Sequence, residues 1–354
     1  MAVVVSPTED SSLRPEVNFT YLQQYVESAM IYRFILIGFG GYVTFGVTMI
    51  GIPGNMVCCM VFHRQGLRDR MNLCLFSLAF VDLVYVTYAL VWSSTVLMAY
   101  YRLFEFNEEK YMTCMRANLG ITYGLRATSG LYSMVIAVER CVCVLFPLRA
   151  SSLLRTRTMA ALLLVLALFP QLGFSPLPIK YQVGQVVTPV GVEWQLIPSQ
   201  LWHQHKDYID AILYMFMSVT VPLLTFISVS LATFITVIKL RAAMSWREKA
   251  TSTIDHSHVQ QTGLTKMLVL TSCVYIITMV PFVSLIVAHL IIPEFSTNGR
   301  LVNIYLALYT LANGFPFINS AVVVFIYYNR SSRFRSEIRI LFSYIKNRKR
   351  VDKV

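Results

Sequence analysis

Seven long apolar stretches, separated by short polar gaps, constrain this chain more than any other feature of its sequence. They cover roughly residues 34–62, 71–100, 112–146, 158–179, 208–238, 264–292 and 301–328. Each reaches the roughly 20 apolar residues that a helix needs to cross a bilayer. Lipid offers no partners to unpaired backbone groups, and the alternation typical of a barrel is missing, so we expect helices. The sequence predicts an all-α membrane protein with a seven-transmembrane helix bundle.

The charge distribution gives the predicted orientation. Only 14% of the residues are charged, whereas soluble domains contain about a quarter. The net charge of +12 does not indicate a nucleic-acid partner, because the basic residues lie in gaps between apolar stretches. Of the 30 Lys and Arg residues, 20 fall in the gaps after the first, third and fifth stretches, at the start of the sixth stretch (Lys266) or in the C-terminal tail. We expect the chain to lie in the plasma membrane. The positive-inside rule then places its N-terminus outside the cell and its C-terminus in the cytoplasm.

Three parts follow from this topology. Residues 1–33 are predicted to form an extracellular tail, in which Asn18 begins an N-glycosylation triplet. Residues 34–328 are predicted to hold the bundle, surrounded by the lipid bilayer. Residues 329–354 are predicted to form a cytoplasmic amphipathic helix and tail, because apolar and basic positions alternate there at helical spacing.

Short motifs along the helices resemble the rhodopsin-like (class A) G-protein-coupled receptors over nearly the whole chain. They are Gly54-Asn55, the run at 72–82, Glu139-Arg140-Cys141 with Pro147 after it, Pro222, Pro281-Phe282 and Ile326-Tyr327-Tyr328. The resemblance implies a receptor, not an enzyme, that passes a signal from an extracellular ligand to a heterotrimeric G protein. Residues 66–79 are similar to those of molluscan-type chemosensory receptors and also of invertebrate neuropeptide receptors. We favour a chemosensory small molecule and keep a neuropeptide as the alternative.

The resemblance also implies a set of switch residues. Glu139 would hold Arg140 at rest and release it to the G protein, although an arginine at a membrane boundary can also be a plain anchor. Gln261 stands where a second acid is usual in the family, which predicts basal activity. Pro147, Pro222, Pro281 and Tyr327 complete this set.

Asp82 is predicted to lie in mid-membrane, where a carboxylate needs polar neighbours. Asn55, Ser129, Asn319 and Ser320 fall at a similar depth. The resemblance implies a sodium ion at Asp82, and the alternative is a structural cluster around a protonated carboxyl group. No other cofactor or metal is expected.

Arg126 is the most informative candidate for ligand binding. It lies 12 residues past Cys114, or about 18 Å down a helix. Such a guanidinium should face the bundle interior and find an anionic partner. Two interpretations stay open: a contact for an acidic ligand, and an internal salt bridge, for which Asp210 is a candidate. Depth alone adds Tyr123, Tyr214, Phe282, Tyr309 and Asn313.

Departures from the family pattern affect the switch and the outer loop. Met279 replaces the usual aromatic residue before the helix-six proline, so Tyr275 is the predicted transmitting ring. Val323-Val324 replaces the helix-seven Asn-Pro pair. The loop at 180–207 has no cysteine to pair with Cys114, so packing must hold it. The predicted anchors are Trp194, Trp202, His203 and His205.

Other protein classes fit less well. A transporter or channel should show repeated halves or rings of intramembrane charge, and the sequence has neither pattern. The six histidines are scattered along the chain, which argues against a membrane enzyme. An amine receptor would need an acid in helix three and an opsin a lysine in helix seven, and the sequence has neither. Serine and threonine in the third cytoplasmic loop (Ser245, Thr251, Ser252 and Thr253) indicate a receptor kinase and arrestin as further partners.

Overall fold

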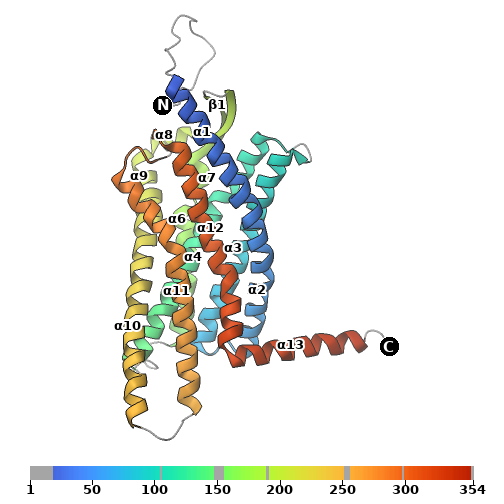
Figure 1. Cartoon of the computed structure of the whole chain (residues 1–354), viewed down its shortest axis with the longest axis vertical. Helices are drawn as coiled ribbons and strands as arrows, with labels where there is room; N and C mark the ends of the chain where they lie inside the picture. Colours follow the sequence, from blue (N-terminus) through green and yellow to red (C-terminus); the bar gives the residue numbers. More distant parts are fainter. Residues whose placement is uncertain are drawn as a thin grey trace, which may run out of the picture.

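The chain folds into a bundle of long helices that run side by side (Figure 1). The computed structural model describes residues 19–103, 106–146, 155–188, 191–250, 256–296 and 299–351. Within these ranges, seven helices are long and apolar enough to cross a membrane. The predicted seven-helix bundle is therefore confirmed.

The first crossing consists of α1 (Phe19–Ile35), a π-helical segment η1 (Leu36–Val43) and α2 (Thr44–Gln65), and the next two are α3 (Arg70–Tyr101) and α4 (Glu108–Leu145). The fourth crossing is α6 (Thr156–Phe174), which continues into the short α7 (Leu177–Lys180). A hairpin of β1 (Tyr181–Thr188) and β2 (Gly191–Pro198) follows, then the short helices α8 (Gln200–Gln204) and α9 (Lys206–Asp210). The last three crossings are η3 (Ala211–Thr220) with α10 (Val221–Ala250), α11 (His256–Ile291) and α12 (Val302–Arg330).

The first helix begins at Phe19, well before residue 34, where its apolar stretch was expected to begin. Residues 19–33 mix polar and apolar side chains and contain neither glycine nor proline, so the backbone can remain helical. This extension packs on α12, where the Asn303 amide donates to the Ser28 hydroxyl at 3.0 Å. Residues 1–18, including Asn18, lie outside the described part of the chain.

Side-chain exposure separates the lipid-facing surface from the core. Ile277, Phe234 and Leu164 are between 62% and 68% exposed, which suits apolar side chains that face lipid. The core contains the fully buried Tyr85 and Tyr327. The same core also holds polar groups, which lead to the candidate sites below.

The last helix, α13 (Ser332–Val351), starts at one end of the bundle and runs sideways away from it (Figure 1). It confirms the helix predicted after the seventh crossing. Phe334 is 1% exposed, and its ring lies 5.7 Å from those of Phe62 and Tyr327. Arg335 donates to the carbonyls of Tyr328 and Asn329 at 2.9 Å, which satisfies the end of α12. We call this end of the bundle the α13 end and the opposite one the hairpin end.

Candidate ligand and coupling sites

Arg126 lies on α4 with its guanidinium between two aromatic rings. Its Cζ atom is 4.1 Å from the centroid of Phe282 and 4.9 Å from that of Tyr123. One Nη–H donates to Oδ1 of Asn313, whose own amide donates to the Tyr309 carbonyl at 2.7 Å. Helices α4, α11 and α12 thus meet at this one cation.

A layer of aromatic side chains lies beside Arg126. The Tyr309 hydroxyl donates to the Tyr123 hydroxyl, and the Tyr309 ring stacks on Tyr305 with centroids 5.7 Å apart. His289 lies 5.4 Å from the Tyr305 ring and 5.1 Å from the Tyr214 ring. The Tyr214 hydroxyl is buried and has no hydrogen-bond partner among the described residues, so it can accept or donate to an incoming polar group.

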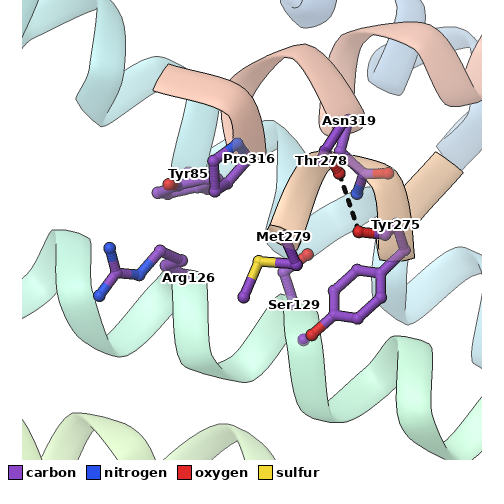
Figure 2. Close-up of a pocket in the computed structure, with 9 residues that line it drawn as sticks. Tyr85, Arg126, Ser129, Tyr275, Thr278, Met279, Pro316 and Asn319 are labelled. Carbon is purple, nitrogen blue, oxygen red and sulfur yellow. Dashed lines mark hydrogen bonds between the residues drawn. The ribbon is translucent and has the colours of Figure 1, made fainter. Parts of the chain in front are cut away.

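Two small cavities adjoin the guanidinium, and each has a volume of about 20 Å³. Figure 2 shows the first of them, with Arg126 and Tyr275 among the residues that line it. Such a volume holds about one water molecule. A larger ligand therefore requires the neighbouring aromatic side chains to move.

Tyr275 crosses from α11 to α4 and lies in both cavity walls. A Cβ atom at Gly130 would lie 3.0 Å from the Tyr275 hydroxyl, so glycine is what lets this ring approach α4. The Thr278 hydroxyl bonds to the Tyr275 carbonyl at 3.0 Å (Figure 2). The ring predicted to replace the usual aromatic residue thus contacts the helix that carries Arg126, while Met279 lines the same cavities.

The structure brings most predicted ligand residues together. Tyr123, Phe282 and Asn313 touch Arg126, while Tyr309 and Tyr214 belong to the adjoining layer. The salt bridge suggested between Arg126 and Asp210 is wrong, because Asp210 pairs with Lys180 at 2.7 Å. Sequence reasoning missed Tyr305 and His289, since nothing in their spacing distinguishes them from other aromatic residues of the two helices.

The hairpin that follows α7 is held without a disulfide, because all cysteines in the described residues are free. Asp210 accepts from Lys180 at 2.7 Å and from the Trp202 indole at 2.9 Å, and we call these three residues the Asp210 clip. The Trp202 anchor is therefore confirmed, whereas His203 and His205 are exposed. Within the described residues no group of three or more His, Cys, Asp and Glu side chains lies together as a metal site.

The hairpin also lies close to the aromatic layer. Arg116 donates to the Tyr181 carbonyl at 3.5 Å, which ties β1 to α4. Burial, followed by the nearby Tyr309 and Asp210, raises the pKa of the Tyr181 phenol to about 12. Its hydroxyl therefore stays protonated at neutral pH and available as a donor beside the layer.

Asp82 lies at the centre of the predicted polar cluster and is 1% exposed. Ser129 donates to its Oδ1 atom at 2.6 Å, and Asn55 donates to the Ser320 carbonyl at 2.9 Å. The Asn319 Oδ1 atom is buried and has no partner among the described residues. A carboxylate, hydroxyls and an orphaned amide oxygen form a set of hard oxygen donors, which fits a sodium ion chemically.

At the α13 end, Glu139 is 1% exposed, and its Oε2 atom lies 2.7 Å from Nε of Arg140. The same carboxylate accepts a second arginine, Arg70 at the start of α3, at 2.8 Å. Sequence reasoning counted Arg70 only as a basic loop residue, because the contact spans 69 positions. Pro147 lies outside the described residues, as do Thr251, Ser252 and Thr253.

The predicted hinge prolines lie where the helices depart from regular geometry or carry a gap in the hydrogen-bond ladder. Pro222 is the second residue of α10, just after the π-helical segment η3, and lines the second cavity. Pro281 lies inside α11, next to Phe282. Each proline leaves one carbonyl of the preceding turn without its helical donor, which lets the helix bend there. Pro316 in α12 lines the first cavity and was not predicted as a switch residue.

Comparison with known proteins agrees with the seven-helix architecture. A family model described as 7 transmembrane receptor (rhodopsin family) matches residues 54–327, which is most of the chain. A search of curated proteins finds no match.

Proposed function

Because the chain belongs to the rhodopsin family of seven-transmembrane receptors, we propose that it passes the signal of an extracellular, acidic chemosensory small molecule to a heterotrimeric G protein. The family supports coupling to a G protein and binding of a ligand. In this proposal the hairpin end faces outward and the α13 end faces the cytoplasm, where receptor kinase and arrestin would also act.

The surroundings of Arg126 are the reason for proposing an acidic ligand. No acidic side chain forms an ion pair with this guanidinium in the described ranges, and its contacts are one amide oxygen and two ring faces. A cation inside a membrane bundle normally has an anionic partner. A ligand carboxylate would supply that charge, and its apolar part would lie against Phe282 and Tyr123.

A small ligand fits this region better than a peptide. The two cavities beside Arg126 have volumes of only about 20 Å³ each. In the adjoining aromatic layer, the Tyr309–Tyr123 bond joins two side chains, and breaking this one bond would let them separate for a small ligand. The unpartnered Tyr214 hydroxyl offers the ligand a second polar contact. Neuropeptide recognition remains the alternative outcome of the experiment below.

The switch then links two sites on α4. Ligand binding at Arg126 would move Tyr275 and α11, with Pro281 and Pro222 as hinges. That motion would free Arg140 from Glu139 at the other end. Sodium at Asp82 would stabilise the resting arrangement of Asn55, Ser129, Asn319 and Ser320 between them.

The test is a calcium response in cells that express the chain with a promiscuous G protein. Pairs of carboxylic acids and their methyl esters, together with short peptides, are applied to the wild type, Arg126→Gln and the control Arg116→Gln. We expect a response to an acid but not to its ester. Loss of the charge-assisted contact, worth about 2 kcal/mol, should lower potency in Arg126→Gln about 30-fold.

The control variant keeps the comparison specific. Arg116 is also a cation on α4, but it contacts the Tyr181 carbonyl near the hairpin, so Arg116→Gln should keep its potency within about threefold. An acid that acts equally on Arg126→Gln and wild type, at matched surface expression, would reject the assignment of Arg126. A response confined to peptides would favour the neuropeptide alternative.

A further inference from the structure

The Glu139 carboxylate contacts two arginines from different helices. Arg70 on α3 donates through Nε to Oε1 at 2.8 Å, with good hydrogen-bond geometry. Arg140 lies 2.7 Å from Oε2, but its Nε–H is not aligned for a hydrogen bond. Each carboxylate oxygen thus has its own guanidinium, and the Arg70 contact is the better directed one.

Arg70 is fixed in place by the turn between α2 and α3. Asp69 caps α3 by accepting the backbone N–H groups of Met71 and Asn72 at 3.0 Å. The Asn72 side chain bonds back to the Gly66 carbonyl at 3.3 Å. A residue at the first position of a capped helix has little freedom to follow α4 or α11 when they move.

Arg70 also bonds to the residue one turn beyond Glu139. Its Nη2 lies 3.1 Å from the Cys143 sulfur, and this thiol donates to Glu139 Oε1 at 3.3 Å. Arg70 therefore joins α3 to the last turns of α4 through two side chains. These contacts do not involve Arg140.

The burial of Glu139 decides what this arrangement does. Its side chain is 1% exposed, and removing the only partner of such a charge is costly because the ion is left desolvated and unpaired. With Arg70 in place, Arg140 can leave and the carboxylate still keeps one cation. Without Arg70, release of Arg140 would leave the buried Glu139 carboxylate without a cation.

We propose that Arg70 is a positioning residue for coupling, which supplies a fixed counter-charge to Glu139 so that Arg140 can be released. The inference rests on the proposed function, in which released Arg140 engages the G protein. It predicts that Arg70 promotes the active state, although it forms an ion pair in the resting one. A purely structural ion pair would not have this effect.

The first test is basal nucleotide exchange, which requires no ligand. The full-length protein in lipid nanodiscs is mixed with each of a panel of purified heterotrimeric G proteins. We compare wild type, Arg70→Gln, Arg70→Lys and the control Arg68→Gln, which removes an exposed arginine two residues away. Arg70→Gln should slow exchange about tenfold or more, Arg70→Lys should recover most of it, and Arg68→Gln should match wild type.

A double variant separates the two roles of Arg70. In Arg70→Gln/Glu139→Gln the buried side chain at position 139 carries no charge and needs no cation, so exchange should return to the level of Glu139→Gln alone. Exchange in Arg70→Gln equal to or faster than in Arg68→Gln would overturn the proposal. A loss that the double variant does not recover would also overturn it and leave Arg70 a structural role.

The second test does not depend on a G protein. Spin labels are attached to noncanonical amino acids introduced in place of His63 of α2 and Lys266 of α11, which are both exposed. The two labels report the distance across the α13 end. Arg70→Gln should lower the fraction of molecules in which the two labels are far apart, as after movement of α11, relative to Arg68→Gln. Identical distance distributions in the two variants would overturn the inference. If no variant exchanges nucleotide, Glu139→Gln included, while the distances still shift, the proposed coupling to a G protein fails, but the role of Arg70 in releasing Arg140 stands.

Discussion

The Asp210 clip should determine how firmly the hairpin is held over the bundle. Asp210→Ala removes the charge-assisted bonds from Lys180 at 2.7 Å and from Trp202 at 2.9 Å. The Lys180 and Asp210 side chains are 16% and 32% exposed, so solvent screens the pair in part. Bonds to charged groups contribute about 1.5–3 kcal/mol when buried and less at the surface, so we expect the two together to contribute about 2 kcal/mol.

Hydrogen–deuterium exchange of the hairpin residues 181–188 and 191–198 measures this contribution. A loss of about 2 kcal/mol should speed local opening, and hence exchange, about 30-fold. Asp210→Asn should give a smaller effect, because the amide oxygen can still accept the Trp202 indole. The overall melting temperature should change little, since the helices do not depend on the clip.

A second ion pair on the same hairpin provides the matched control. Arg33 and Glu193 lie 2.7 Å apart, but their side chains are 61% and 25% exposed. Exposed pairs contribute about 0–1 kcal/mol, so Arg33→Ala should change hairpin exchange only a few-fold. Equal effects of Asp210→Ala and Arg33→Ala, or none in either, would show that the less exposed Asp210 clip does not hold the hairpin in place of a disulfide.

Three further predictions concern the bundle itself. Gly54→Leu should lower the stability to thermal unfolding by about 2 kcal/mol, because a Cβ atom there lies 2.8 Å from Val324, and Val324→Ala in the same chain should restore it. Tyr309→Phe, which removes the hydroxyl bond to Tyr123, should cost about 1 kcal/mol by the same measurement; an unchanged melting curve would show that the bond does not hold the aromatic layer together. Sodium chloride should raise the melting temperature above that in choline chloride for wild type but not for Asp82→Asn, and equal temperatures for wild type would reject the sodium proposal.

The bundle could be predicted because its physical basis is local. A helix in lipid must satisfy its own backbone, so length and hydropathy suffice to find each crossing. The extension of the first helix from Phe19 could not be found in this way, because it depends on packing against α12 through Asn303. The hairpin was missed for a similar reason, since its strands pair with each other and lie on α4 outside any apolar stretch.

Two candidate sites were predictable because one residue type is out of place, and the Glu139–Arg140 pair was predictable because its motif resembles that of a known family. A cation in an apolar stretch pointed to Arg126, and an acid in one pointed to Asp82. The partners of these residues depend on three-dimensional contacts, which is why Asp210 was assigned to the wrong cation. Arg70 gave no signal at all, because a basic residue after the first helix is what the positive-inside rule leads one to expect.

The most direct test of signal transfer from Arg126 to Arg140 is ligand-stimulated nucleotide exchange with purified components. The chain, reconstituted in nanodiscs with a heterotrimeric G protein, is exposed to the most potent acid from the cell assay. Exchange should rise with the acid in wild type, fail to rise in Arg140→Ala at equal ligand binding, and require about 30-fold more acid in Arg126→Gln. Exchange that the acid does not stimulate, or that Arg140→Ala leaves intact, would contradict signal transfer from Arg126 to Arg140.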